Sequence, residues 1–180
     1  MNLSLRRFAL LFALILIHGC TGKDDASMSQ QNAEGNAITQ EEDLIVTTLN
    51  NIANAESQFS KTIDSPSILR FYTQDYAGVK DGKSQTVKDQ EIYLAEVLAR
   101  INSDEPIGIL SRVMNIKATV AGTFGWATYE YEYKVVRSGM LQRYSNGRCT
   151  AIFRKQVEAW LIRHEHCSTA NPAPFFLTPK

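Results

Sequence analysis

Apolar residues in the first half of the chain recur with the spacing of one helical face. They begin just after a Thr-x-x-Glu capping box formed by Thr39 and Glu42. The positions are Ile45, Leu49, Ile52, Phe59 and Ile63. This pattern predicts a long amphipathic helix over residues 41–62.

Two further helices are predicted along the chain. The first covers residues 65–72, where a serine cap is followed by a proline in the first turn. Residues 80–83, Lys-Asp-Gly-Lys, have the composition of a tight turn. The capping pattern then returns at Thr86 and Asp89, and apolar residues at helical spacing predict a helix over residues 87–101.

From residue 107 onward the hydrophobic period changes from 3.6 to 2, which is typical of strands with one buried and one exposed face. The strands are predicted over residues 107–120, 127–134, 140–154 and 159–168, with a bulge at Asn146 and Gly147 in the third. In the predicted order, the helices come first and antiparallel strands follow. This order predicts an α+β domain, in which the helices pack on a strongly curved sheet.

The N-terminus has the features of an export signal. Arg6 and Arg7 precede an apolar run over residues 8–17, which is shorter than the roughly 20 residues needed to span a bilayer. The segment Ile-His-Gly-Cys that ends at Cys20 is similar to a lipobox, whose cysteine carries the lipid anchor. His18 departs from that pattern, and an uncleaved or differently cleaved signal is the alternative.

These features divide the chain into four parts. We expect a lipoprotein signal peptide at 1–19, lipidated Cys20 with a flexible polar tether at 20–38, the folded domain at 39–170 and a proline-rich tail at 171–180. A threonine after the cysteine favours the outer membrane, with the domain facing the periplasm or the exterior. Contact with the membrane is then through the lipid alone.

The charge of the chain is balanced, with 19 basic and 19 acidic residues. Such a chain has no net positive field that would attract a nucleic acid, so no nucleic-acid partner is expected.

Three segments of the domain carry a resemblance to a known family. They are Phe71-Tyr72-Thr73 with Asp75-Tyr76, Gly147-Arg148-Cys149-Thr150 with Phe153-Arg154-Lys155, and the Trp-x-x-x-His-x-His-x-Ser segment 160–168. With the order of helices and strands, they resemble the nuclear transport factor 2-like superfamily, which includes ketosteroid isomerase, SnoaL-like proteins and the association domain of calmodulin-dependent protein kinase. The resemblance implies a cone-shaped fold over about residues 40–170.

The chain departs from two members of that superfamily at positions that matter for function. Ala151 and Cys167 stand where the kinase association domain has the arginines of its basic pocket. No aspartate on the strands matches the isomerase base, since the acids there are Glu130, Glu132 and Glu165. Neither an acid-binding pocket nor the isomerase mechanism is therefore carried over.

The candidate ligand contacts are aromatic residues, one arginine and two histidines. They are Tyr72, Tyr76, Trp126, Tyr129, Tyr131, Arg148, His164 and His166. The alternatives are a plain core or dimer interface for the aromatic residues, a salt bridge to Glu165 or Glu132 for Arg148, and structural hydrogen bonds for the histidines. No Cys/His cluster has metal-ligand spacing, so neither a metal nor a cofactor is expected.

Cys149 and Cys167 are candidates for a disulfide. If residues 155–159 close a hairpin, the two cysteines lie opposite each other or one position apart. An exported compartment permits the bond, and two free cysteines are the alternative.

The leading functional hypothesis is a membrane-anchored domain that binds a small molecule or peptide in its pocket, or serves as an assembly module. A homodimer through the outer face of the sheet is expected. The alternative is a SnoaL-like isomerase, cyclase or hydratase in which His164 or His166 acts as general acid or base.

Overall fold

The computed structural model describes residues 24–170, with side chains from residue 36 onward. The elements in this range are α1 (Asp24–Thr62), α2 (Pro66–Leu69), β1 (Tyr72–Lys80), β2 (Lys83–Thr86), α3 (Val87–Ile101), β3 (Ile107–Ala121), β4 (Phe124–Arg137), β5 (Met140–Gln156) and β6 (Ala159–Thr169). The predicted α+β class is confirmed. The predicted signal peptide, Cys20 and the tail at 171–180 lie outside the described residues.

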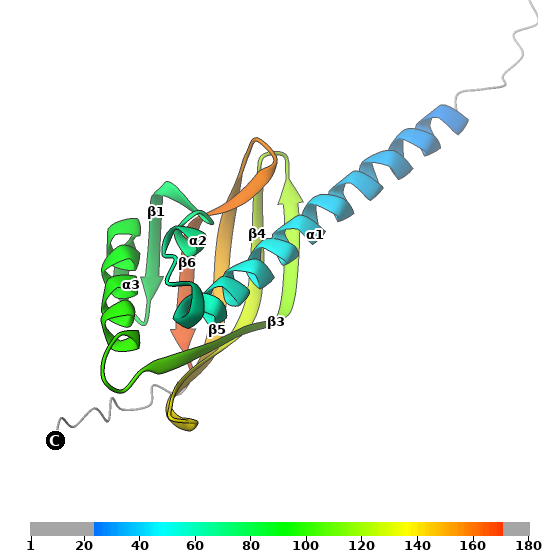
Figure 1. The fold of residues 1–180 in the computed structure, drawn as a ribbon. Helices are drawn as coiled ribbons and strands as arrows, with labels where there is room; N and C mark the ends of the chain where they lie inside the picture. The colour runs from blue at the N-terminus through cyan, green and yellow to red at the C-terminus, as the bar shows by residue number, and fades with distance from the viewer. Residues whose placement is uncertain (1–23, 171–180) are drawn as a thin grey trace, which may run out of the picture. The chain divides into compact units, whose positions relative to one another are not determined.

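The domain described below is the compact unit that begins at Asn36. Its strands form one six-stranded sheet in the order β2-β1-β6-β5-β4-β3 (Figure 1). Neighbouring strands are antiparallel except β1 and β6, which are parallel. The strands predicted from residue 107 onward are antiparallel as expected. β1 and β2, which were not predicted as strands, extend this sheet, and β1 can lie parallel to β6 because no hairpin joins the two.

The long helix α1 buries the apolar stripe that its sequence predicts. Ile45 and Phe59 are fully buried, and Leu49 and Ile52 are nearly so. Figure 1 shows α1 crossing in front of the strands, and the stripe packs on sheet residues that share one face, which we call the inner face. These include Ala127, Ala151, Phe153, Trp160 and Ile162. Each large side chain buried in this way stabilises the fold by about 1.5–3 kcal/mol.

Helix α1 begins earlier than the sequence predicts. It starts at Asp24 and continues through Thr39, so Thr39 lies inside the helix and is not its N-cap. The predicted flexible tether at 20–38 is therefore helical from Asp24 onward. A polar composition prevents burial but does not oppose a helix, and residues 24–38 include three Ala and two Gln, which favour helix formation.

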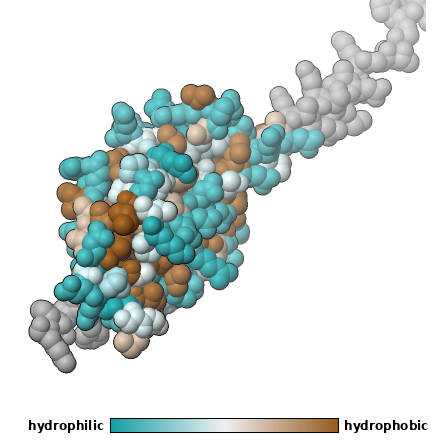
Figure 2. All heavy atoms as spheres, viewed as in Figure 1, coloured by the Kyte–Doolittle hydropathy of each residue, from teal (hydrophilic) through white to brown (hydrophobic). Residues whose placement is uncertain are grey.

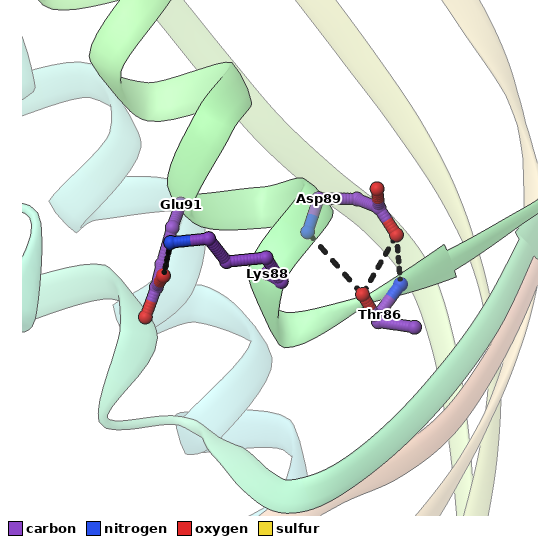
Figure 3. A network of polar contacts seen from close by, with 4 residues as sticks. All are labelled: Thr86, Lys88, Asp89 and Glu91. Carbon is purple, nitrogen blue, oxygen red and sulfur yellow. Dashed lines mark hydrogen bonds and ion pairs between the residues drawn. The ribbon is translucent and has the colours of Figure 1, made fainter.

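The second capping prediction is confirmed at α3. The hydroxyl of Thr86 accepts a hydrogen bond from the backbone N–H of Asp89 at 3.3 Å, and the Asp89 carboxylate accepts one from the backbone N–H of Thr86 at 2.8 Å (Figure 3). Lys88, in the same turn, forms an exposed ion pair with Glu91 at 2.9 Å. The helix buries Leu94, Val97 and Ile101 in a second part of the core.

The bulge predicted at Asn146 and Gly147 is absent, because both residues pair in regular register with Glu132 and Tyr131 of β4. Gly147 has a different role. A Cβ atom at this position would lie 2.0 Å from the backbone oxygen of Ser168 on β6. The glycine therefore permits β5 and β6 to approach each other closely.

A bulge is found in β6 instead. The register between β5 and β6 shifts by one residue between the pairs Phe153–Ile162 and Ile152–His164, which leaves Arg163 without a partner in the ladder. The Arg163 guanidinium donates to the backbone oxygen of Asp75 at 3.0 Å and pairs with the carboxylate of the same residue. This contact fixes the bulge against β1, whose own register is irregular between Tyr72 and Ala77.

The bulge at Arg163 exchanges the two faces of β6. Trp160 and Ile162 are buried on the inner face before it, while Glu165 and Cys167 face inward after it. His164 and His166 are consequently turned to the opposite, outer face of the sheet, as are their partners Ile152 and Thr150 of β5. Without the bulge, strict alternation from Trp160 would have carried both histidines inward.

On the surface in view in Figure 2, hydrophilic residues predominate and hydrophobic ones show at several places between them. In the described part of the chain, no helix is both long and apolar enough to cross a membrane.

Candidate functional site

A cavity of about 100 Å³ lies between α1 and the inner face of the sheet. Apolar side chains of α1 close one side of it, and tyrosines of β1 and β4 form much of the remaining wall. The lining residues that carry polar chemistry are Glu56, Tyr72, Lys80, Ser111, Tyr129, Tyr131, Tyr133 and Glu165, together with Cys149 and Cys167.

Glu165 is the carboxyl that β6 brings into the cavity after its bulge. The hydroxyl of Tyr129, on β4, donates a hydrogen bond to it. Burial raises the pKa of Glu165 above its ordinary value, although the Tyr129 hydrogen bond and the charge of Lys80 act in the opposite direction. Burial and the neighbouring Glu165 charge likewise raise the pKa of Tyr129. Tyr129 therefore stays a neutral hydrogen-bond donor.

Glu56 is a second carboxyl in the same cavity and comes from α1. It accepts a hydrogen bond from the Ser111 hydroxyl at 2.6 Å. Ser57 fixes Ser111 in turn, because its hydroxyl accepts from the Ser111 N–H at 2.8 Å and donates to the Ser111 carbonyl oxygen at 3.1 Å. Burial raises the pKa of Glu56, and the nearby charge of Glu165 acts in the same direction. Two carboxyls that both resist ionisation thus share one small space.

The tyrosines of the cavity differ in how their hydroxyls are satisfied. Tyr133 is bonded to Tyr93 at 2.7 Å, and Tyr131 to Thr169 at 2.9 Å. Tyr72, whose ring packs edge-on against Tyr76 with centroids 4.9 Å apart, has no hydrogen-bond partner among the described residues. Its hydroxyl is therefore available to a molecule in the cavity.

The predicted disulfide is confirmed: Cys149 and Cys167 are bonded, as directly opposed residues of β5 and β6 with Cα atoms 4.1 Å apart. Both cysteines line the cavity. A carboxylate oxygen of Glu165 and the two sulfurs all lie within 4.8 Å of one another. These three residues would resemble a set of metal ligands, but two sulfurs that are bonded to each other are not thiolate ligands.

The structure divides the candidates from the sequence between the two faces of the sheet. Tyr72, Tyr129 and Tyr131 line the cavity, and Tyr76 is buried in the core beside it. The remaining candidates, Trp126, Arg148, His164 and His166, are on the outer face. The structure thus places neither histidine where it could act on a molecule in the cavity.

The outer face carries a wider and shallower groove. Its volume is about 740 Å³, and Lys117, Arg148 and His166 are among its lining residues. Arg148 pairs with Glu130 at 3.1 Å, and Asn115 donates to the same carboxylate at 2.8 Å. The salt bridge weighed for Arg148 therefore exists, although its partner is Glu130 and not Glu132 or Glu165.

Sequence reasoning missed Glu56 and Glu165 as cavity residues. A signal for Glu56 was present, because it stands on the apolar stripe of α1, four residues after Ile52 and three before Phe59. Glu165 had no comparable signal, because its inward orientation depends on the bulge at Arg163.

Comparisons with solved structures show the same fold. A candidate aromatic ring hydroxylase from Novosphingobium aromaticivorans has a TM-score of 0.61 and 16% identity, covering 74% of this chain and 92% of that one. A nuclear transport factor 2-like protein of unknown function from Pseudomonas putida has a TM-score of 0.55 and 16% identity, covering 72% and 87%. A ketosteroid isomerase-like protein from Erwinia carotovora atroseptica has a TM-score of 0.50 and 17% identity, covering 73% and 98%. At these identities the likeness concerns the fold alone.

No curated protein matches the sequence. The family model described as a SnoaL-like domain matches residues 49–172, which is more than half of the 180 residues. The chain therefore belongs to the SnoaL-like domain family, within the nuclear transport factor 2-like superfamily.

Proposed function

We propose that the domain binds a small, uncharged organic molecule in the cavity between α1 and the sheet. The observation that carries this proposal is the unpaired hydroxyl of Tyr72 beside the carboxyls Glu56 and Glu165 in one aromatic-walled space. Aromatic walls with a few convergent polar groups are usual for sites that bind small molecules.

The size and charge of the cavity restrict the ligand. About 100 Å³ is well below the roughly 300 Å³ at which sites for drug-sized ligands begin, so a single small ring is a suitable occupant. The raised pKa values of both carboxyls disfavour their charged forms, and a second negative charge in the ligand would be repelled by any carboxylate that does form. A neutral molecule with a carbonyl or hydroxyl group fits both conditions.

The proposal is tested by thermal shift with small ring compounds, cyclopentanone and phenol, and by native mass spectrometry of the purified protein. We expect a rise in melting temperature that falls in Tyr72→Phe, because one ligand hydrogen bond contributes about 0.5–1.5 kcal/mol. Tyr144→Phe is the control, since the Tyr144 hydroxyl bonds Glu132 and does not line the cavity. No shift with any compound and no retained ligand would overturn the proposal.

A second candidate function is proton transfer on the bound molecule. The specific observation in its favour is the half-buried Glu165 carboxyl, which is hydrogen-bonded to Tyr129, because a carboxyl with a raised pKa beside a neutral donor suits general acid–base chemistry. Glu165 takes the role that the sequence had suggested for His164 or His166. The test is exchange of the hydrogens next to the carbonyl of cyclopentanone in heavy water, followed by proton NMR. Exchange that persists unchanged in Glu165→Gln would exclude this function.

We further propose that the domain is held at the outer membrane by a lipid on Cys20. The proposal is supported by the apolar run over residues 8–17 and the following Gly-Cys pair. Metabolic labelling with a palmitate analogue should mark the wild-type protein and not Cys20→Ser. Equal labelling of both proteins, or none of either, would contradict the anchor.

A further inference from the structure

The wall of the cavity contains a group that the proposed function does not use, the Cys149–Cys167 disulfide. Both cysteines line the cavity, although they are only 5% and 6% exposed. This disulfide differs from an ordinary buried disulfide because the Glu165 side chain lies beside it. Glu165 stands two residues before Cys167 on the same face of β6, with a carboxylate oxygen within 4.8 Å of both sulfurs.

Lys80 lies on the Cys167 side of the disulfide, because β1 pairs with β6 and not with β5. It lies opposite Cys167 in the parallel pairing of β1 with β6, and its side chain lines the cavity over the ring of Tyr131. A neighbouring cation favours the thiolate form of a cysteine, and the thiol with the lower pKa leaves faster from a disulfide. The sulfur of Cys167 is therefore the better leaving group, and that of Cys149 is the one to be attacked.

We propose that small aliphatic thiols enter the cavity and exchange with the Cys149–Cys167 disulfide, with Glu165 carrying the proton. The inference rests on the proposed function in one respect, that small molecules have access to the cavity. It adds a class of reactant, thiols and their disulfides, that a binding pocket does not by itself require.

The exchange is balanced at each step. The incoming thiol gives its proton to the Glu165 carboxylate, and its sulfur forms a bond to the sulfur of Cys149. The Cys149–Cys167 bond breaks, its electron pair leaves with Cys167, and Glu165 returns the proton to that thiolate. A second thiol then gives its proton to Glu165, and its sulfur forms a bond to the small-molecule sulfur of the mixed disulfide. The bond to Cys149 breaks, its electron pair leaves with the Cys149 sulfur, Glu165 passes the proton to that sulfur, and a small disulfide is released. Two small thiols are thereby oxidised and the protein disulfide is reduced, while a small disulfide restores it by the reverse reaction.

The cavity selects thiols by size. A space of about 100 Å³ admits 2-mercaptoethanol, whereas the tripeptide thiol glutathione is far larger. A disulfide that reacts only when the domain unfolds would not distinguish between the two in this way. The ratio of their rates, compared at equal concentrations of thiolate, therefore reports whether reaction occurs inside the folded cavity.

The experiment measures the rate of reduction of the oxidised wild-type protein by 2-mercaptoethanol, with quenching and mass spectrometry. We expect a mixed disulfide on Cys149, and a rate that falls about 100-fold in Glu165→Gln, the usual scale for loss of a proton carrier. Glu158→Gln is the matched control. Glu158 lies at the exposed turn between β5 and β6 and is not one of the residues that line the cavity, so the rate of this variant should stay near the wild-type value.

The pH dependence of the wild-type rate gives a test that needs no variant. Without a proton carrier, the rate falls about tenfold for each pH unit below the pKa of the thiol, because only the thiolate reacts. With Glu165 accepting the proton, the rate stays level until Glu165 itself becomes protonated. The groups around Glu165 are Tyr129 on β4, Lys80 on β1, Glu56 on α1 and His164 beside it on β6.

Three results would overturn the inference: equal rates for wild-type protein and Glu165→Gln, glutathione reacting as fast as 2-mercaptoethanol, or a tenfold fall per pH unit throughout. Each of these leaves the proposed function standing if cyclopentanone or phenol still shifts the melting temperature. The absence of any small-molecule effect, thiols included, would remove both.

Discussion

The positions of Glu56 and Glu165 in the cavity have a cost in folding free energy. A carboxylate loses its hydration when it enters a small aromatic-walled cavity, and the loss is recovered only through hydrogen bonds to its oxygens. Ser111 supplies one such bond to Glu56, and Tyr129 supplies one to Glu165. These contacts do not cancel the effect of burial, since the pKa of each carboxyl remains raised. Both residues therefore release their protons at a higher pH than an exposed carboxyl group does.

This cost predicts how stability depends on pH. In the folded protein both pKa values lie above the ordinary 4.5 that holds in the unfolded chain. Below pH 4.5 the groups are protonated in both states. As the pH rises through the raised values, the unfolded chain has already released its protons, so the free energy of unfolding falls. Urea unfolding at a series of pH values should show this fall in the wild-type protein and a smaller one in Glu56→Gln/Glu165→Gln.

The matched control for this prediction is Glu158→Gln, at the exposed turn between β5 and β6. It removes one carboxyl without changing the cavity, and we expect it to retain the wild-type pH dependence. A double cavity variant whose stability follows pH as steeply as the wild-type protein would show that Glu56 and Glu165 do not cause the fall.

At the scale of the element, α3 is held at its first turn by local contacts. Thr86 and Asp89 satisfy each other's backbone N–H groups, and both residues are exposed (Figure 3). Thr86→Ala should lower the free energy of unfolding by about 1 kcal/mol, as measured by urea denaturation, because a helix N–H loses its partner. Lys88→Ala in the same turn removes only an exposed ion pair and should change little. Equal effects of the two substitutions would contradict the role of the cap.

The Thr86 cap and the disulfide show which features the sequence predicts well. The Thr86 cap depends on residues three positions apart, and the disulfide depends on a hairpin whose turn is visible between β5 and β6. Both follow from short-range patterns. The start of α1 was predicted wrongly because a short-range pattern can also mislead. The sequence has a capping box at Thr39, but the helix extends through this residue.

The site depends on a feature that no short-range pattern in β6 reveals. Alternation along β6 is regular in the sequence, and the extra residue at Arg163 is recognisable only once Asp75 of β1 is seen to bind it. The single extra residue at Arg163 turns Glu165 into the cavity and His166 to the outer face. The fold class was therefore predictable from periodicity, whereas the chemistry of the site required the tertiary contact.

At the scale of the whole molecule, the outer face of the sheet carries an exposed apolar patch formed by Phe124, Trp126 and Ile152. Trp126 is 46% exposed and Ile152 is 41% exposed, and the two are directly opposed on β4 and β5. Phe124, 51% exposed, lies two residues before Trp126 on the same face. Exposed apolar patches of this kind usually mark a site of association. We propose that a second copy of this chain covers the patch, because a two-fold dimer brings identical surfaces together.

If the dimer forms through the outer face, a charge on that face should disrupt it and a charge on α3 should not. Trp126→Glu places a charge in the centre of the patch and should convert the dimer to a monomer in sedimentation velocity experiments, because a buried unpaired carboxylate is costly. Ile92→Glu is the matched control, since Ile92 is 49% exposed on α3, away from the outer face. It should leave the dimer intact. A wild-type protein that sediments as a monomer at every concentration, or a dimer that survives Trp126→Glu, would contradict the proposal and leave the cavity as the domain's one proposed binding surface.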